Sequence, residues 1–261
     1  MTRTAPSAML TAPTLPQANR YGINALAAAQ LQVDIAPYPG MEEGDLIELF
    51  WNNCFADSRR VSACKIGTPT RLRIPQSFVQ DGSAQIHYQV MQIGHGPARS
   101  AVTHVRVKTC PPGGQPSPLF NDENQNLAPV SLPDMIRRYG INGSQVRRGI
   151  PLSIEPYAHM ATGDAITLRW GDVRLDLPTI QSKDVGLTVQ VWVPSAVIVE
   201  AGDDCRLDVT YCILDRVGNN SRWAPARTLN IAACSSQAPA RPAGATSTYQ
   251  PRQPGSPCEP G

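Results

Sequence analysis

Cysteine offers the most chemistry in this chain, because seven cysteines occur among its 261 residues. Nine residues separate Cys54 from Cys64, a spacing that a surface disulfide can span if the chain meets an oxidising compartment. Two free thiols are the alternative. Cys205 and Cys212 cannot pair along one strand, since seven steps of about 3.3 Å place them roughly 23 Å apart. The total is odd, so at least one thiol is unpaired in a monomer.

Other groups that could bind or activate a substrate are scattered along the chain. No Cys-x-x-Cys pair and no Cys/His cluster has zinc spacing, so we expect no metal site. No nucleophile elbow accompanies the histidines, and no glycine loop joins a strand to a helix as a phosphate cradle would. The sequence therefore predicts no enzyme, no catalytic residue and no cofactor. The histidines are expected on the surface: His87, His95, His104 and His159.

Composition narrows the partners and the fold class. The 23 basic and 21 acidic residues leave a net charge of +2, too little to indicate a nucleic-acid surface. No apolar run approaches the roughly 20 residues that cross a bilayer, and the first residues lack the apolar stretch of a signal peptide. Proline (25) and glycine (20) are too frequent for a helical protein, because both interrupt regular structure. Many short strands are expected.

An internal repeat organises the elements. The motif Arg20-Tyr-Gly-Ile-Asn24 returns as Arg138-Tyr-Gly-Ile-Asn142, 118 residues later. The segment Ile35–Met41 returns as Ile154–Met160 at an offset of 119, which also relates Trp51 to Trp170. Matches that keep their order over nearly a hundred residues predict two homologous tandem domains.

Alternation then predicts which side chains are buried. Ile47, Leu49 and Trp51 share one face of an extended strand, and Ile166, Leu168 and Trp170 repeat the set. Further along each repeat, Tyr88 and Tyr211 fall on the apolar side of a strand, whereas His87 falls on the wetter side. We therefore place four aromatic residues in the cores: Trp51, Tyr88, Trp170 and Tyr211. About seven short strands per repeat predict an all-β fold of two tandem immunoglobulin-like β-sandwiches.

Composition also suggests boundaries. We expect an N-terminal extension over 1–14, domains over 15–110 and 132–234, a Pro-rich linker over 111–131 and a disordered tail over 235–261. Helix is expected only in short stretches, such as 24–31 and 133–138. Cys110 and Cys234 end the two repeats at the same place, where free thiols are favoured over covalent links.

The acidic residues before the Trp51 strand have two interpretations. Glu42, Glu43 and Asp45 could be calcium ligands, but such a site needs six or more oxygens. The second repeat retains only Asp164 in the equivalent stretch. A role in turn formation is therefore favoured over metal binding.

Together, Pro-Tyr-Pro-Gly-Met41, Glu-Gly-Asp45, Trp51, Ile74-Pro75 and Ile86-His-Tyr-Gln-Val90 resemble the tandem Ig-like repeats of large bacterial surface and adhesin-type proteins, especially those of pseudomonads. The second repeat keeps Pro156-Tyr157, Gly163-Asp164, Trp170 and Val193-Pro194. The resemblance covers about residues 10–234. It implies an extracellular or cell-surface scaffold with structural or adhesive roles, and it supplies no catalytic residues.

Two functions remain open. The first is a non-enzymatic structural or adhesive scaffold at the bacterial surface. The second is a protein- or glycan-binding module that uses the loop 52–70, which differs most between the repeats and carries Arg59, Arg60 and Lys65. Since no export signal is seen, a cytoplasmic location stays open, and the oligomeric state is not predicted.

Overall fold

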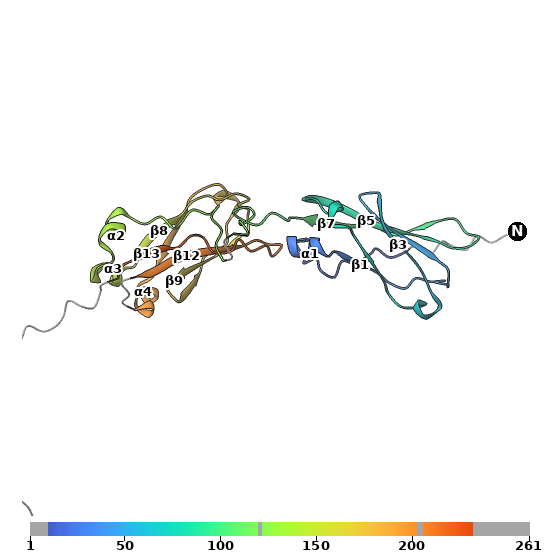
Figure 1. Ribbon diagram of the computed structural model, residues 1–261, viewed down its shortest axis with the longest axis horizontal. Coiled ribbons are helices and arrows are strands. Elements are labelled where there is room, and N and C mark those ends of the chain that lie inside the picture. Colours follow the sequence, from blue (N-terminus) through green and yellow to red (C-terminus); the bar gives the residue numbers. More distant parts are fainter. Residues whose placement is uncertain (1–9, 120–121, 203–205, 232–261) are drawn as a thin grey trace, which may run out of the picture.

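The computed structural model describes residues 10–119, 122–202 and 206–231. They form two immunoglobulin-like β-sandwiches that follow one another along the long axis of the molecule (Figure 1). All strand pairs are antiparallel. The predicted fold class is therefore confirmed. The predicted tail, together with Cys205 and Cys234, lies outside the described residues.

Each sandwich packs a two-stranded sheet against a larger one. In the first sandwich, β1 pairs with β4, while β3, β2 and β5 lie side by side and both β6 and β7 pair with the other edge of β5. In the second, β8 pairs with β11, and the larger sheet has the order β10-β9-β12-β13. The strands are β1 (Gln32–Ile35), β2 (Leu46–Trp51), β3 (Cys54–Arg60), β4 (Thr70–Arg73), β5 (Gly82–Met91), β6 (Ala98–Arg99), β7 (Thr103–Val107), β8 (Ile150–Ile154), β9 (Ala165–Trp170), β10 (Val173–Asp176), β11 (Val189–Val193), β12 (Leu207–Leu214) and β13 (Arg227–Leu229).

Helices are short and lie at sheet ends. Helix α1 (Ala25–Ala29) lies within the first stretch where helix is expected, and α2 (Asp134–Tyr139) ends one residue beyond the second. The structure also has α3 (Gly143–Arg148) and α4 (Ser195–Ala201), which apolar periodicity does not reveal because each spans at most two turns. Single 3₁₀ turns occupy Ala63–Lys65, Gln76–Phe78 and Ser182–Asp184. Asn24 caps α1, and Asn142 forms a capping box with Gln145 at α3.

The aromatic residues placed in the cores by alternation lie there. Trp51 and Tyr88 belong to the core of the first sandwich, and Trp170 and Tyr211 to that of the second. None of the four side chains is more than 2% exposed. The phenol of Tyr211 also donates a hydrogen bond to the carbonyl oxygen of Ala128 at 2.9 Å.

His87 is not on a wet face, contrary to the prediction. It is 3% exposed and stacks on Phe50, which lies directly opposite on β2, with ring centroids 4.9 Å apart. Burial lowers the pKa of the imidazole, and the nearby Arg99 lowers it further. The outer face of the larger sheet is covered here by side chains from neighbouring strands, a contact that alternation along one strand does not reveal. The other three histidines are exposed, as predicted: His95, His104 and His159.

The segment 52–70 is not a loop throughout, which corrects a second prediction. Asn52 and Asn53 adopt φ values of 50° and 65°, and they turn the chain directly into the seven-residue strand β3. Asparagine tolerates this left-handed region, so the pair makes a two-residue hairpin. Arg59 and Arg60 therefore lie on an edge strand of the larger sheet.

The predicted linker packs on the second sandwich near both of its ends. Leu127 and Val130 are 2% and 0% exposed and belong to the second core. The amide of Gly113 donates a hydrogen bond to the carbonyl oxygen of Ala158 at 2.7 Å. Because 111–131 is rich in proline and polar residues, its composition does not reveal that Leu127 and Val130 anchor it in the second core.

Replacing Trp170 by alanine removes a fully buried side chain and should lower the free energy of unfolding of the second sandwich by about 3–5 kcal/mol. Trp192→Ala is the matched control, because its ring is 57% exposed and its loss should cost less than about 1 kcal/mol. Urea denaturation of both variants measures the difference. Equal losses would contradict the strand orientation.

Candidate functional site at the junction of the two sandwiches

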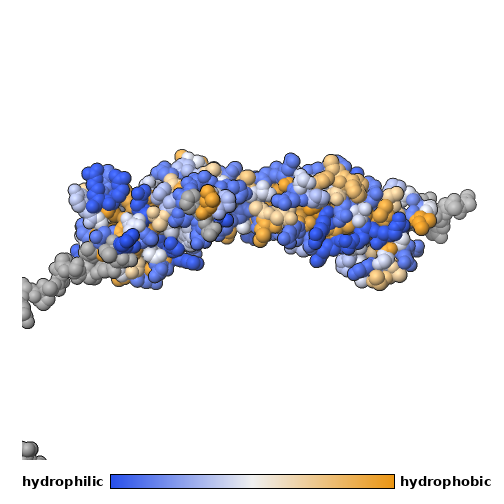
Figure 2. Space-filling view, viewed as in Figure 1, coloured by the Kyte–Doolittle hydropathy of each residue, from blue (hydrophilic) through white to orange (hydrophobic). Residues whose placement is uncertain are grey.

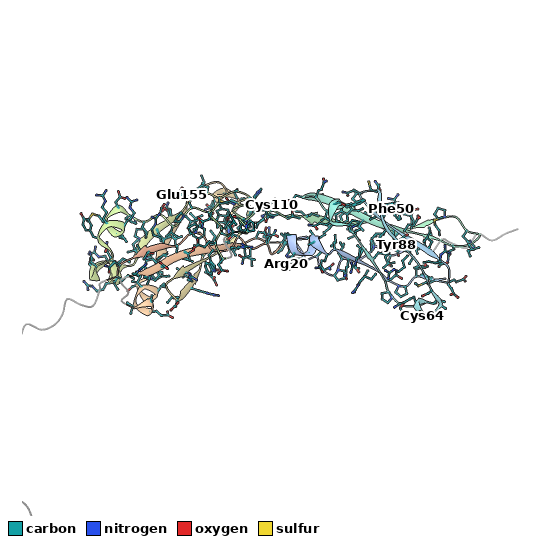
Figure 3. All side chains as sticks on the ribbon, in the orientation of Figure 1. Arg20, Phe50, Cys64, Tyr88, Cys110 and Glu155 are labelled. Carbon is teal, nitrogen blue, oxygen red and sulfur yellow. The ribbon has the colours of Figure 1, made fainter. Side chains whose placement is uncertain are left out.

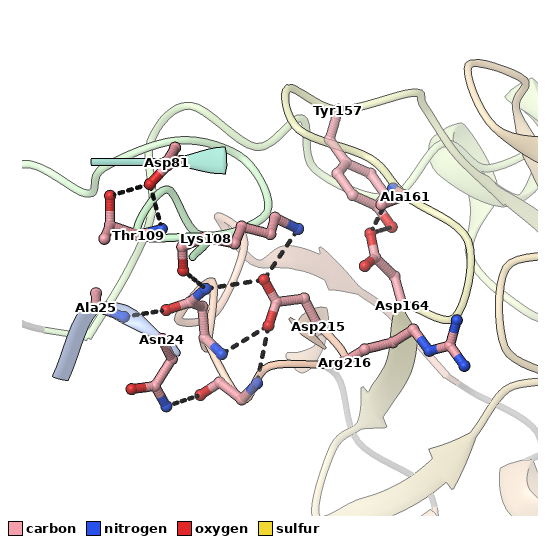
Figure 4. Close-up of polar contacts among 12 residues, drawn as sticks. Asn24, Ala25, Asp81, Lys108, Thr109, Tyr157, Ala161, Asp164, Asp215 and Arg216 are labelled. Atoms are coloured by element: carbon pink, nitrogen blue, oxygen red, sulfur yellow. Dashed lines mark hydrogen bonds and ion pairs between the residues drawn. The ribbon is translucent and has the colours of Figure 1, made fainter. Parts of the chain in front are cut away.

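The β12–β13 connection forms a hairpin turn, residues 215–219, that reaches the first sandwich (Figure 4). Asp215 organises this turn, because its Oδ1 accepts hydrogen bonds from the amides of Gly218 and Asn219 at 2.9 and 2.8 Å. Gly218 has φ of 96°, a conformation that side chains disfavour. Interactions within 215–219 therefore fix the conformation of the turn, without a contribution from the first sandwich.

A largely buried ion pair joins the turn to the first sandwich. Lys108 Nζ lies 2.9 Å from Asp215 Oδ2, with side-chain exposures of 21% for the lysine and 1% for the aspartate. The Nδ2 of Asn219 donates to the same carboxylate oxygen at 2.9 Å. A buried charge that loses its partner is costly, so this pair resists separation of the two sandwiches.

Asn219 bridges two backbone segments of the first sandwich. Its Oδ1 accepts a hydrogen bond from the amide of Ala25 at 2.9 Å, at the start of α1. Its Nδ2 donates to the carbonyl oxygen of Lys108 at 2.8 Å. The Nδ2 of Asn19 adds a hydrogen bond to the carbonyl oxygen of Arg216 at 3.1 Å. These bonds fix both the distance and the rotation between the parts they join.

The repeated Arg-Tyr motif supplies an aromatic contact at the junction. Arg20 and Arg216, one from each sandwich, lie over the ring of Tyr21 with guanidinium carbons 4.6 and 4.2 Å from the centroid. The hydrogen bond from Arg216 lowers the pKa of the Tyr21 phenol. In the second repeat the equivalent Tyr139 is 75% exposed. Figure 3 places Arg20 and Cys110 between the two sandwiches.

A buried tyrosine–aspartate pair recurs in both repeats. Tyr38 donates to Asp45 at 2.8 Å, and Tyr157 donates to Asp164 at 2.9 Å. Burial, reinforced by the nearby carboxylate, raises the pKa of each phenol above its usual value. The oxygen that accepts the tyrosine hydroxyl also serves a turn, because the same Oδ2 atom accepts the amide of Glu42 in Asp45 and the amide of Ala161 in Asp164. Both aspartates thus stabilise turns, and the constant spacing from tyrosine to aspartate was the signal available in the sequence.

Asp164 borders a cavity of about 320 Å³ at the junction, which Tyr21, Arg106, Lys108 and Arg216 also line. The carboxyl is completely buried, and burial raises its pKa. No described residue bonds to its Oδ1. Within the described residues, no group of three or more His, Cys, Asp or Glu is arranged to hold a metal ion.

The residues singled out in 52–70 are all exposed but are not at the junction. Cys54 lies on β3 and Cys64 in the turn Ala63–Lys65, and both are free thiols in the structure. Cys64 lies at the outer edge of the first sandwich (Figure 3). Arg60 donates a hydrogen bond to the carbonyl oxygen of Gly44 at 3.2 Å, and the side chains of Arg59 and Lys65 are exposed to solvent. A disulfide between the two cysteines stays a prediction.

No protein-family model matches the sequence, and no curated protein matches it either. Solved structures with a similar chain path include a Ca²⁺-stabilised adhesin with which an Antarctic bacterium binds ice, 16% identical with a TM-score of 0.41 over 87% of this chain and 49% of that one. Another belongs to a 1.5-MDa bacterial ice-binding adhesin, 16% identical with a TM-score of 0.37 over 87% of this chain and 66% of that one. The fibronectin(III)-like modules of Clostridium thermocellum CbhA are 7% identical, with a TM-score of 0.41 over 86% of this chain and 96% of that one. The chain spans about half of the first of these and two thirds of the second.

Lys108→Met leaves the Asp215 carboxylate buried without its counter-charge, and we expect the free energy of unfolding to fall by about 3–5 kcal/mol. The control is Arg71→Met, which removes the pair with Asp34, whose side chains are 59% and 23% exposed; this pair should contribute less than about 1 kcal/mol. Chemical denaturation compares the two. A loss no larger for Lys108→Met than for Arg71→Met would show that the junction pair does not stabilise the protein.

Proposed function

We propose that this chain is a non-enzymatic structural module in which two Ig-like sandwiches are held end to end as a stiff, extended scaffold at a bacterial surface. The observation that carries the proposal is the junction. Its ion pair, asparagine bridge and aromatic contact come from residues about 110 to 200 positions apart in the sequence. A spacer that only separated two sites would not require such contacts.

The arrangement of the sandwiches supports a scaffold role. They lie in line, so the ends of the molecule that point away from the junction are far apart (Figure 1). On the face shown in Figure 2, apolar side chains form scattered patches among hydrophilic ones. Among the described residues, no helix is long and apolar enough to cross a membrane. Adhesion and attachment to a cell surface are the finer parts of the proposal and follow the sequence resemblance.

A second candidate function is recognition of a protein or glycan by the edge of the first sandwich. The observation that favours it is the combination of an exposed aromatic ring with cations. Phe55 is 52% exposed on β3, the strand that also carries Arg59 and Arg60, and Lys65 follows in the next turn. Aromatic and arginine side chains are the residues that most often anchor a binding surface.

Stiffness is tested by loosening the junction without touching either core. In the double variant Lys108→Met/Asn219→Ala, we expect small-angle X-ray scattering to show a shorter mean maximum dimension and a broader distance distribution than in the unmodified chain. The control Arg71→Met should leave both unchanged, and circular dichroism should show that all variants keep their strands. A double variant with an unaltered scattering profile would remove the support for a stiff scaffold.

Recognition is tested by charge reversal of Arg59, Arg60 and Lys65 to glutamate. If this edge binds a glycan, the unmodified chain should bind members of a glycan array and the triple variant should lose that binding at least about tenfold, which corresponds to about 1.4 kcal/mol. Reversal of Arg137 and Arg147, exposed on the second sandwich, is the matched control. Equal binding by both variants would exclude this edge as the glycan-binding surface.

A further inference from the structure

The second sandwich has an open groove between two strand edges. A cavity of about 660 Å³ lies between β10, at the edge of the larger sheet, and β11, at the edge of the smaller one. Its lining is mixed: Leu175, Leu177, Ile180 and Val191 contribute apolar side chains, and polar residues such as Thr179 and Gln190 lie beside them. Trp192, 57% exposed, also lines the groove. An exposed strand edge beside apolar side chains is a template for pairing with another strand.

The backbone of β11 offers unpaired hydrogen-bonding groups to this groove. On β8, the amide and carbonyl of Ser153 bond to Ser131 on the side away from β11. Its cross-strand partner Gln190 is therefore at a position where the two strands exchange no hydrogen bond, and so is Trp192, which lies opposite Pro151. Proline has no amide to donate, which fits that position. The amides and carbonyls of Gln190 and Trp192 therefore point away from β8, toward the groove.

In the first sandwich, a side chain binds one amide at the equivalent edge, which borders a smaller cavity of about 450 Å³. There Asp57, opposite Leu49 on β2, accepts a hydrogen bond from the amide of Arg73 on β4 at 2.9 Å. The repeat aligns Arg73 with Trp192, and Leu175, opposite Leu168, takes the place of Asp57. The second sandwich therefore has an apolar residue where the first has the carboxylate that binds the amide of Arg73. An added strand would supply what Asp57 supplies in the first sandwich.

We propose that residues 246–250 of this chain, Thr-Ser-Thr-Tyr-Gln, add as a strand to the edge of β11. Thirty residues follow Ile231 in the sequence, and the fourteen that precede Thr246 can span about 46 Å when extended. The eight-residue strand β12 is only about 27 Å long, so the segment can reach any part of the second sandwich.

The composition of the segment suits this position. It contains no charge, proline or glycine, and its threonines and tyrosine favour extended structure. Gly244 and Pro251 lie close to its two ends, so the strand would be short. Alternation places Ser247 and Tyr249 on one face, where the tyrosine ring can cover the apolar floor of the groove. Covalent attachment gives it a millimolar effective concentration that a free peptide would not have.

Amide hydrogen exchange of Gln190 and Trp192, followed by NMR in the full chain, tests the proposal. We expect Thr248→Pro to accelerate exchange of both amides by about tenfold, because proline at the centre of the added strand removes its pairing. Ser236→Pro, in the same tail but outside the segment, is the matched control and should leave both rates unchanged. The amide of Arg73, bonded to Asp57, is an internal reference that neither variant should alter.

Since both substitutions lie outside the described sandwiches, a change in exchange is not expected from unfolding, and unchanged rates at buried β12 amides verify this. Identical exchange of Gln190 and Trp192 in the unmodified chain and in Thr248→Pro would overturn the proposal. Protection that rises with protein concentration would overturn it as well, because a second copy would then cover the edge.

Discussion

The Asp215 carboxylate is the group on which the arrangement of this molecule depends. Its side chain is 1% exposed, and it is compensated by Lys108 from the other sandwich, by Asn219 and by two amides of its own turn. A charge with so little contact with water must keep its partners, because desolvation is repaid only while the ion pair and hydrogen bonds persist. Away from the first sandwich, the Asp215 carboxylate would keep the hydrogen bonds of its own turn but lose its counter-charge. That dependence turns two separately formed cores into one extended body.

The same tyrosine–aspartate pair occurs in both repeats, but its surroundings differ between the two sandwiches. In the first sandwich, Asp45 accepts hydrogen bonds from Tyr38 and from Gln92 as well as from a turn amide. Its counterpart Asp164 lies at the junction and leaves one carboxylate oxygen without a partner among the described residues. In the first sandwich Asp57 likewise binds the edge amide of Arg73, whereas the second sandwich has Leu175 at that place. The second sandwich therefore has fewer polar partners at these two places, one of which borders the junction and the other the groove.

The sequence predicts the parts of the structure that depend on local periodicity and on the repeat. Alternation placed Trp51 and Trp170 inward, and the matching motifs indicated two sandwiches. Alternation does not predict the burial of His87, which Phe50 covers from the neighbouring strand. Nor does it indicate that the Asn52–Asn53 turn leads into a strand. The junction could not be found this way, because Lys108 and Asp215 are 107 positions apart and neither stands out in its own segment. Such pairs emerge only when two sandwiches meet.

Residual dipolar couplings of the backbone amides, measured by NMR on the weakly aligned full chain, test the central claim most directly. If the junction holds the two sandwiches as one body, the couplings from β1–β7 and from β8–β13 fit a single alignment tensor, with the orientation seen in Figure 1. If the two sandwiches require separate tensors of different magnitude, they move independently, and the account of a stiff scaffold is wrong.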